Sequence, residues 1–82
     1  LDPRDYENFL IGYARLSAKE LEICCALARG LSTRQCAEQL GCAVSTIDTY
    51  RKRIYDKTKI HKVRQLQLCY ALMRMQQAEQ EI

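Results

Sequence analysis

Apolar residues recur along this 82-residue chain at spacings of three and four, which is the pattern of one buried face on an α-helix. No stretch alternates steadily between apolar and polar residues as a half-buried strand does, and no Asn-Gly or Asp-Gly pair marks a hairpin. The sequence therefore predicts an all-helical fold.

Capping signals divide this pattern into five helices. Asp2 followed by Pro3 is typical of an N-cap with proline at the first helical position. The stretches "SAKE" from Ser17 and "STRQ" from Ser32 are capping boxes, and a glycine follows each of the helices that they open. The expected helices run from 3 to about 13, from 17 to 29, from 32 to 40, from about 45 to 58, and from about 63 into the tail "QQAEQEI".

The last expected helix has more apolar surface than one core contact requires. One stripe consists of Val63, Leu66, Cys69, Tyr70 and Met73, and a second stripe on the other side consists of Leu68, Leu72 and Met75. A surface helix needs only one core-facing stripe. We interpret the second stripe as a contact with a partner. The alternative is that the first helix packs there with its apolar face of Tyr6, Phe9, Leu10 and Tyr13.

Positive charge is concentrated in the middle of the chain. Residues 31–62 hold seven bases and three acids, whereas residues 1–30 hold four bases and five acids and residues 63–82 hold two of each. A concentrated basic segment in a small domain is typical of proteins that bind nucleic acid.

The cysteines and the N-terminus indicate a cytoplasmic protein. Five cysteines, none of them in C-x-x-C spacing, favour small core residues in a reducing compartment, with metal binding and redox sensing as alternatives. No apolar run approaches the length of a membrane span, and the N-terminus lacks the plan of a signal peptide. We therefore expect no membrane contact and no cofactor or metal. The absence of an initial Met suggests a segment of a longer protein.

Two short helices around Gly41, with small Ala37 on the first and the bases on the second, have the plan of a helix-turn-helix. Four motifs around them occur in order: Leu16, Ser17, Lys19 and Glu20; Ala28, Gly30, Leu31 and Ser32; Cys36, Ala37, Leu40 and Gly41; and Thr46, Ile47, Thr49, Tyr50 and Arg51. With these motifs, the stretch from about Leu16 to Tyr70 resembles the LuxR/NarL/GerE type of DNA-binding domain.

The resemblance implies an all-α, four-helix LuxR-type helix-turn-helix domain over residues 16–82. The helix that Asp2 and Pro3 begin is then an extra N-terminal linker helix over residues 1–15. The resemblance also implies a homodimer through the last helix, for which the second stripe supplies the expected interface residues Leu68, Leu72 and Met75.

Three residues at and after the end of the expected helix from about 45 to 58, which corresponds to the DNA-recognition helix of the family, depart from the family pattern. Thr58, Lys59 and Lys62 stand where a leucine, a glycine and a capping serine are usual. Because lysine is a poor N-cap, the start of the last helix is predicted to be frayed or shifted by a residue.

The cysteines also depart from the family pattern. Cys24, Cys36 and Cys42 stand where the family usually has Leu or Ile, which supports a core position for each of them. Cys25 and Leu21 share one helix face at positions that are usually polar. We expect the N-terminal helix to cover them, and a contact with a missing partner domain is the alternative.

The fourth helix is expected to present its polar side to DNA. If Ile47 and Ile54 point into the core, the outward half contains Ser45, Asp48, Thr49, Lys52, Arg53 and Asp56. In helix-turn-helix docking the N-terminal residues of the second helix face base edges, and the resemblance places base contacts at the same positions. The predicted base readers are Asp48, Thr49 and Lys52, and the predicted DNA-backbone contacts are Ser32, Thr33, Arg34, Ser45, Thr46, Tyr50, Arg51 and Arg53.

Each predicted base reader suits a different base. Lys52 suits guanine O6 and N7, the Thr49 methyl group suits thymine, and Asp48 could accept a hydrogen bond from cytosine N4. Asp48 has a second interpretation, an ion pair with Lys52 four residues later. Asp56 is expected to be solvated or paired with a neighbouring base, and His61 is expected to be a surface residue.

These patterns lead to one main hypothesis and two alternatives. The main hypothesis is the double-stranded-DNA-binding output domain of a bacterial transcription regulator, which binds without catalysis because no nucleophile and base, paired acids or phosphate loop is present. The first alternative is a promoter-reading domain like that of a sigma factor, with RNA polymerase as its partner. The second is a protein-interaction or redox module that uses Cys25.

Overall fold

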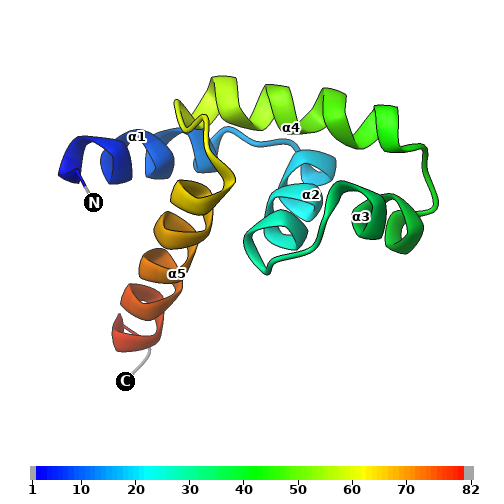
Figure 1. Cartoon of the computed structure of the whole chain (residues 1–82). Coiled ribbons are helices and arrows are strands. Elements are labelled where there is room, and N and C mark those ends of the chain that lie inside the picture. The colour runs from blue at the N-terminus through cyan, green and yellow to red at the C-terminus, as the bar shows by residue number, and fades with distance from the viewer. Residues whose placement is uncertain (1, 81–82) are drawn as a thin grey trace.

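The computed structural model describes residues 2–80, and these residues form five helices and no strand (Figure 1). The helices are α1 (Pro3–Ala14), α2 (Ala18–Ala28), α3 (Thr33–Leu40), α4 (Val44–Thr58) and α5 (Val63–Gln80). The predicted all-helical fold is therefore confirmed. The end of the predicted last helix, residues 81 and 82, lies outside the described residues.

The predicted caps begin the first three helices. The Asp2 carboxylate accepts a hydrogen bond from the Arg4 backbone N–H at 2.9 Å, and Pro3 follows it in the first turn. Ser17 with Glu20, and Ser32 with Gln35, form both bonds of a capping box. Local sequence thus determines where these helices begin.

The ends of α4 differ from the simplest expectation. The helix begins at Val44, one residue early, after an N-cap Ala43 that has no side-chain hydrogen bond. At its other end the buried Thr58 hydroxyl donates to the Ile54 carbonyl at 2.7 Å and accepts from the Ile60 N–H at 3.4 Å. Threonine therefore satisfies backbone groups at a buried helix end, which the usual leucine could not do.

The residues after Thr58 close the helix and begin the next one. Lys59 adopts the left-handed conformation, with φ 60°, in the place of the usual glycine. The Lys62 carbonyl accepts a hydrogen bond from the Leu66 N–H at 3.1 Å, and α5 begins at Val63. The start of α5 is therefore at the expected residue, and the predicted shift is not observed.

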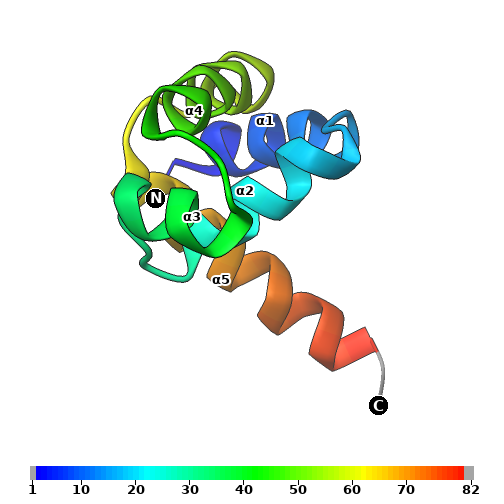
Figure 2. The ribbon, with the colours of Figure 1, turned by 90° about the vertical axis from the view of Figure 1, so that its right-hand side faces the viewer.

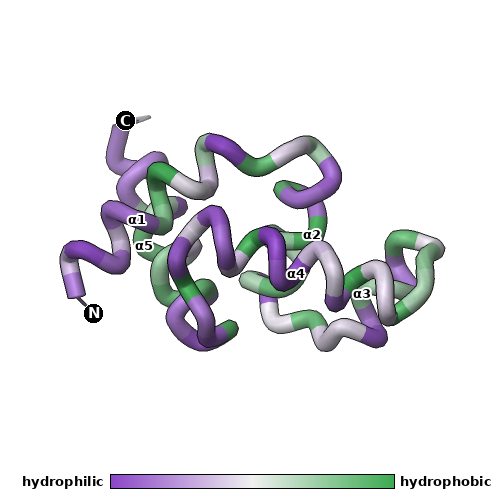
Figure 3. Tube along the Cα trace, turned by 90° about the horizontal axis from the view of Figure 1, so that it is seen from above, coloured by the Kyte–Doolittle hydropathy of each residue, from purple (hydrophilic) through white to green (hydrophobic). Residues whose placement is uncertain are grey.

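One hydrophobic core holds all five helices together. Helix α4 packs against α1, α2 and α3, and α5 packs against α2 and α1 (Figure 2). Seen from above, both hydrophilic and hydrophobic residues occur along the trace of α4 (Figure 3). The buried apolar residues are Phe9, Leu16, Ile23, Cys24, Ala26, Leu27, Cys36, Ala37, Ile47, Ile54, Ile60, Leu66, Cys69 and Met73.

Helix α1 touches the backbone of α4 at one glycine. A Cβ atom on Gly12 would collide with the Lys57 carbonyl oxygen and lie 2.5 Å from the Thr58 Cα atom. Because the two backbones meet there, no larger residue fits without moving one of the helices. Phe9, one helical turn earlier on α1, is fully buried in the core. Helix α1 is therefore packed into the fold.

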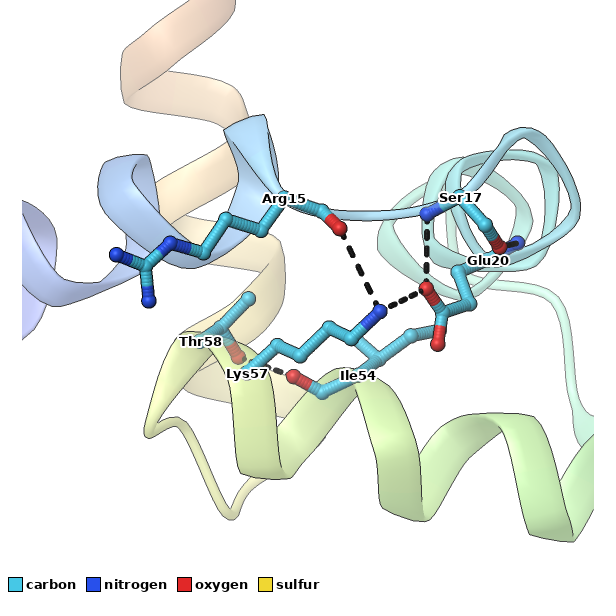
Figure 4. Close-up of polar contacts among 6 residues, drawn as sticks. All are labelled: Arg15, Ser17, Glu20, Ile54, Lys57 and Thr58. Atoms are coloured by element: carbon cyan, nitrogen blue, oxygen red, sulfur yellow. Dashed lines mark hydrogen bonds and ion pairs between the residues drawn. The ribbon is translucent and has the colours of Figure 1, made fainter.

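An ion pair reinforces this contact. The Lys57 ammonium donates to the Glu20 carboxylate at 2.6 Å and to the Arg15 carbonyl at 3.4 Å (Figure 4). Glu20 is only 3% exposed, and the hydrogen bond from Lys57 is the main cause that lowers the pKa of its carboxyl group. Lys57 thus joins the end of α1, the start of α2 and the end of α4.

Several positions on the helix faces differ from the predicted pattern. Leu10 was expected on the apolar face of α1, but it is exposed, because it lies about 100° from Phe9 around the helix. Val63, expected in the core-facing stripe of α5, is also exposed; it is the first residue of the helix and lies about 60° from Leu66. The core stripes are therefore narrower than predicted.

The cysteines all carry free thiols, and most of them have the predicted environment. Cys24 and Cys36 are fully buried, and Cys42 is half-buried against the core. The Cys25 sulfur lies 3.7 Å from the Tyr13 hydroxyl of α1, which confirms that the N-terminal helix covers it. Burial raises the pKa of Cys24 to about 12, so that thiol stays protonated and unreactive at neutral pH.

Candidate nucleic-acid interface

Helices α3 and α4 pack against each other across a glycine turn. Gly41 has φ 69°, which favours glycine, and the Cys42 N–H donates to the Ala37 carbonyl at 3.0 Å. Ala37 and Ile47 are both buried between the helices and the rest of the core. This packing leaves the opposite side of α4 free to meet another molecule.

The outward side of α4 is polar and open. Ile47 and Ile54 are fully buried, as predicted, so the residues on the far side of the helix face solvent. Ser45, Thr49, Lys52 and Arg53 are exposed, and Asp48, Thr46, Tyr50 and Arg51 are half-buried along the two flanks. The structure thus brings the predicted residues of this helix onto one continuous surface.

Two side chains on this surface are already engaged within the helix. The Thr49 hydroxyl donates to the Ser45 carbonyl at 3.0 Å, so its methyl group is the part that remains for an outside contact. The Arg53 guanidinium lies 5.3 Å from the centre of the Tyr50 ring, at cation–π distance. Within the described chain, Lys52 forms no ion pair and its ammonium is free for an acceptor.

Asp48 pairs with Arg51, and the predicted alternative pair with Lys52 is wrong. The Asp48 carboxylate lies 3.2 Å from an Nη atom of Arg51, three residues later. The Arg51 Nε atom is enclosed by protein and has no hydrogen-bond partner among the described residues. Arg51 was expected to reach outward to phosphate, but its side chain lies along the flank of α4 beside Asp48.

The other predicted surface residues lie where expected. Asp56 is exposed and forms no ion pair with any described residue, which agrees with the solvated interpretation. His61 is also exposed. Neither residue therefore contributes to the fold through a side-chain pair within residues 2–80.

The start of α3 offers backbone donors to an anion. The capping box uses the N–H groups of Ser32 and Gln35, which leaves those of Thr33 and Arg34 outside the bonds of the helix itself. Ser32 and Arg34 are exposed and Thr33 is half-buried. A helix start with free N–H groups and an exposed arginine suits a phosphate group.

The second apolar stripe of α5 remains largely uncovered. Leu68 is 53% exposed, Met75 is 63% exposed, and Leu72 is half-buried. Helix α1 meets α5 through the Tyr6 hydroxyl, which donates to the Gln76 side chain at 2.6 Å. The alternative in which α1 covers the second stripe is therefore wrong for Leu68 and Met75.

Sequence reasoning missed the role of Lys57. Five residues separate Lys57 from Lys52, which places the two side chains about 140° apart around the helix. Lys57 belongs to the basic segment, but its ammonium points to Glu20 (Figure 4). No local signal could show this, because the partners are separated by 37 residues. Within residues 2–80 there is no pocket and no group of three or more His, Cys, Asp or Glu residues that could hold a metal.

Two helices packed across a glycine turn, the second with an open basic face, define a helix-turn-helix domain of the DNA-binding class. The sequence profile described as "Bacterial regulatory proteins, luxR family" matches residues 14–70, and the chain belongs to this family. None of the helices in the described part of the chain has both the length and the apolar character needed to cross a membrane.

Comparison with characterised proteins agrees with this family. The chain is 35% identical over 49 residues to "Response regulator UvrY" of Escherichia coli (strain K12), which covers 60% of this chain and 22% of that protein. The same identity and coverage hold for the UvrY protein of Shigella flexneri. The chain thus spans about a fifth of the length of these curated relatives. No solved structure matches significantly.

Proposed function

We propose that this domain binds a specific sequence of double-stranded DNA, with α4 in the major groove, and that it is the output part of a transcription regulator. The observation that carries the proposal is the two-sided character of α4. Ile47 and Ile54 fix one side in the core, and the other side presents Lys52 and Arg53, neither of which forms an ion pair within the described residues, to a polyanion. The domain acts by binding and not by catalysis.

The DNA contact that we propose for each residue of α4 depends on its position along the helix. Residues near the start of the helix enter deepest, so Asp48, Thr49 and Lys52 read base edges. Residues on the flanks and at the start of α3 hold the DNA backbone: Ser32, Thr33, Arg34, Ser45, Thr46, Tyr50 and Arg53. The Arg53 guanidinium, held over Tyr50, has little freedom to lose when it meets a phosphate.

The wider organisation follows from the exposed surfaces and from the family. We propose that residues 1–15 form the link to a sensory portion in a longer chain, and that residues 16–82 bind DNA as a homodimer. Leu68, Leu72 and Met75 of α5 form the dimer contact, because their exposure leaves an apolar strip that a second copy could bury. RNA polymerase is the further partner that a transcription regulator would contact.

Selection of bound duplexes from a random pool tests the binding function, and two variants then test the contacts. Arg34→Ala should weaken binding to every duplex about equally and lower the salt slope by about one unit, because it removes a phosphate contact. Asp48→Asn should instead reduce discrimination at one base pair by about 1–3 kcal/mol. The absence of any enriched sequence would refute sequence-specific binding.

The dimer contact has its own test. Leu68→Glu should leave the helical circular-dichroism spectrum unchanged but weaken self-association, measured by sedimentation, and cooperative occupancy of paired half-sites. Gln77→Glu, which adds the same charge at an exposed position of α5, is the control and should change neither property. Loss of helical structure in Leu68→Glu would mean that the stripe belongs to the core of the monomer.

A further inference from the structure

The Asp48 and Arg51 side chains form an ion pair on the flank of the recognition surface. At about 100° per residue, Arg51 lies about 40° from the buried Ile47 and Asp48 lies about 100° from it. Arg51 is thus nearer the core than Asp48, and its tip reaches outward to the carboxylate at 3.2 Å. The arginine stands behind the acid, on the side away from an approaching duplex.

The Arg51 stem is held by the protein at the same time. Its Nε atom is enclosed without a partner, so part of the guanidinium has already lost contact with water. Tyr55, one helical turn later on α4, is half-buried against the core. A side chain packed in this way has fewer orientations than the exposed Arg53.

The ion pair contributes little to folding stability. The Asp48 and Arg51 side chains are 41% and 37% exposed, and pairs this open add little to the stability of a protein. A planar guanidinium is, however, well suited to fixing the direction of a carboxylate. It also offsets the negative charge that Asp48 would bring close to the phosphates. Both effects matter only when Asp48 meets DNA.

We infer that Arg51 is a positioning residue, which orients and partly neutralises the Asp48 carboxylate so that Asp48 can read a base, and that it does not hold phosphate. The inference rests on the proposed function, because it assigns a partner to a proposed base reader. The competing assignment, reached from the sequence, is that Arg51 contacts a phosphate directly. To do so it would have to leave both Asp48 and its enclosed position.

Binding measurements separate the two assignments. We compare four proteins: the wild type, Arg51→Met, Asp48→Asn and the double variant. Each protein is titrated with the selected duplex and with the three duplexes that differ from it at the base pair that Asp48 reads. The titrations are repeated at several salt concentrations. Arg51→Met keeps an apolar stem of similar length and removes the charge. If Arg51 positions Asp48, discrimination at that base pair falls by at least about fivefold, and the salt slope falls by clearly less than the one unit expected for a lost phosphate contact. The double variant then loses no more discrimination than Asp48→Asn.

The matched control is Arg53→Met on the same helix. It removes an exposed arginine that is assigned to phosphate, so it should weaken all duplexes equally and lower the salt slope by about one unit. If Arg51→Met behaves like Arg53→Met, the positioning role is overturned while sequence-specific binding stands. If wild type shows no preference among the duplexes, the proposed function fails, and the positioning role fails with it.

A measurement without DNA tests the pair itself. The enclosed Arg51 Nε–H should give a slowly exchanging cross-peak in a ¹H–¹⁵N spectrum of the free domain, and Asp48→Asn should move that peak. A peak that does not respond would show that the two side chains are independent, which overturns the inference. This spectrum also shows that each variant is folded, so that a change in discrimination is not caused by unfolding.

Discussion

The two halves of α4 have opposite environments. The half from Ile54 to Thr58 is held by backbone contact with Gly12 of α1 and by the ion pair of Lys57 with the buried Glu20 of α2. The buried Thr58 hydroxyl satisfies the backbone at the end of this half. In the half from Val44 to Arg53, only Ile47 is fully buried, and the polar side chains face outward or lie along the flanks. Because a helix is stiff, the contacts of the C-terminal half of α4 also fix the direction of its N-terminal half. The residues that hold this helix are thus different from those proposed to read DNA.

The largest effect that should follow from this difference is at Gly12. Alanine is the better helix former by about 1 kcal/mol, so propensity alone predicts that Gly12→Ala stabilises the protein. The added Cβ would instead press on the backbone of α4 at Lys57 and Thr58. We expect a net loss of about 2–3 kcal/mol in the free energy of unfolding, measured with urea.

The matched control for Gly12→Ala is Asn8→Ala on the exposed side of α1. It should change the free energy of unfolding by no more than about 0.5 kcal/mol. If both variants behave alike, the backbone contact does not hold α4, and the contrast between its halves disappears.

A smaller loss is expected at Lys57. Lys57→Met keeps the stem but leaves the buried Glu20 carboxylate without its ammonium partner. Breaking a fully buried pair costs about 3–5 kcal/mol, but Lys57 is partly exposed, so we expect about 2 kcal/mol at neutral pH. The comparison variant is Lys52→Met, which removes an unpaired ammonium from the other half of α4 and should have little effect on stability.

The Glu20 pair also predicts a pH dependence. The folded pKa of Glu20 lies below its usual 4.5, so its contribution is fully present above that value and is lost as pH falls through the folded pKa. Unfolding measured from neutral to acidic pH should show the free energies of wild type and Lys57→Met converge in acid. A difference that stays constant with pH would show that the pair does not carry the effect.

The smallest effect on stability is expected in the open half. Lys52→Ala should change the free energy of unfolding by less than about 0.5 kcal/mol, because the side chain is exposed and unpaired within the described chain. The same variant should clearly weaken binding to the selected duplex. The control is Asp56→Ala, at an exposed position farther along α4, which should leave both stability and sequence preference nearly unchanged. A loss of sequence preference in Asp56→Ala would mean that the base-reading surface extends into the half from Ile54 to Thr58.

Features governed by neighbouring residues were predictable from the sequence. The capping boxes at Ser17 and Ser32 require only a hydroxyl and an acceptor three residues later, and both formed as expected. The inward direction of Ile47 and Ile54 followed from helical spacing, and it determined which side of α4 is open. The prediction of a helix-turn-helix therefore rested on short-range sequence patterns together with the family resemblance.

Features governed by tertiary contact were not predictable in the same way. The contact of Gly12 with Lys57 joins residues distant in sequence, and a glycine inside a helix gives no indication of its neighbour. By spacing alone, Asp48 could pair with Arg51 three residues later or with Lys52 four residues later. The structure has the pair with Arg51, whose stem is packed against the protein, and no spacing rule predicts that packing. The exposure of Leu10 likewise depends on how α1 is rotated against the core.

The contact between Tyr13 and Cys25 gives the protein a natural kinetic probe. Cys25 is partly exposed and the Tyr13 hydroxyl lies against its sulfur, so movement of α1 away from α2 should increase the access of a thiol reagent to this cysteine. An increase in the rate of Cys25 modification, followed by peptide mass spectrometry, then reports a loosening of α1 while the rest of the domain stays folded. Cys42, half-buried and distant from α1 in the chain, provides the internal reference in the same sample.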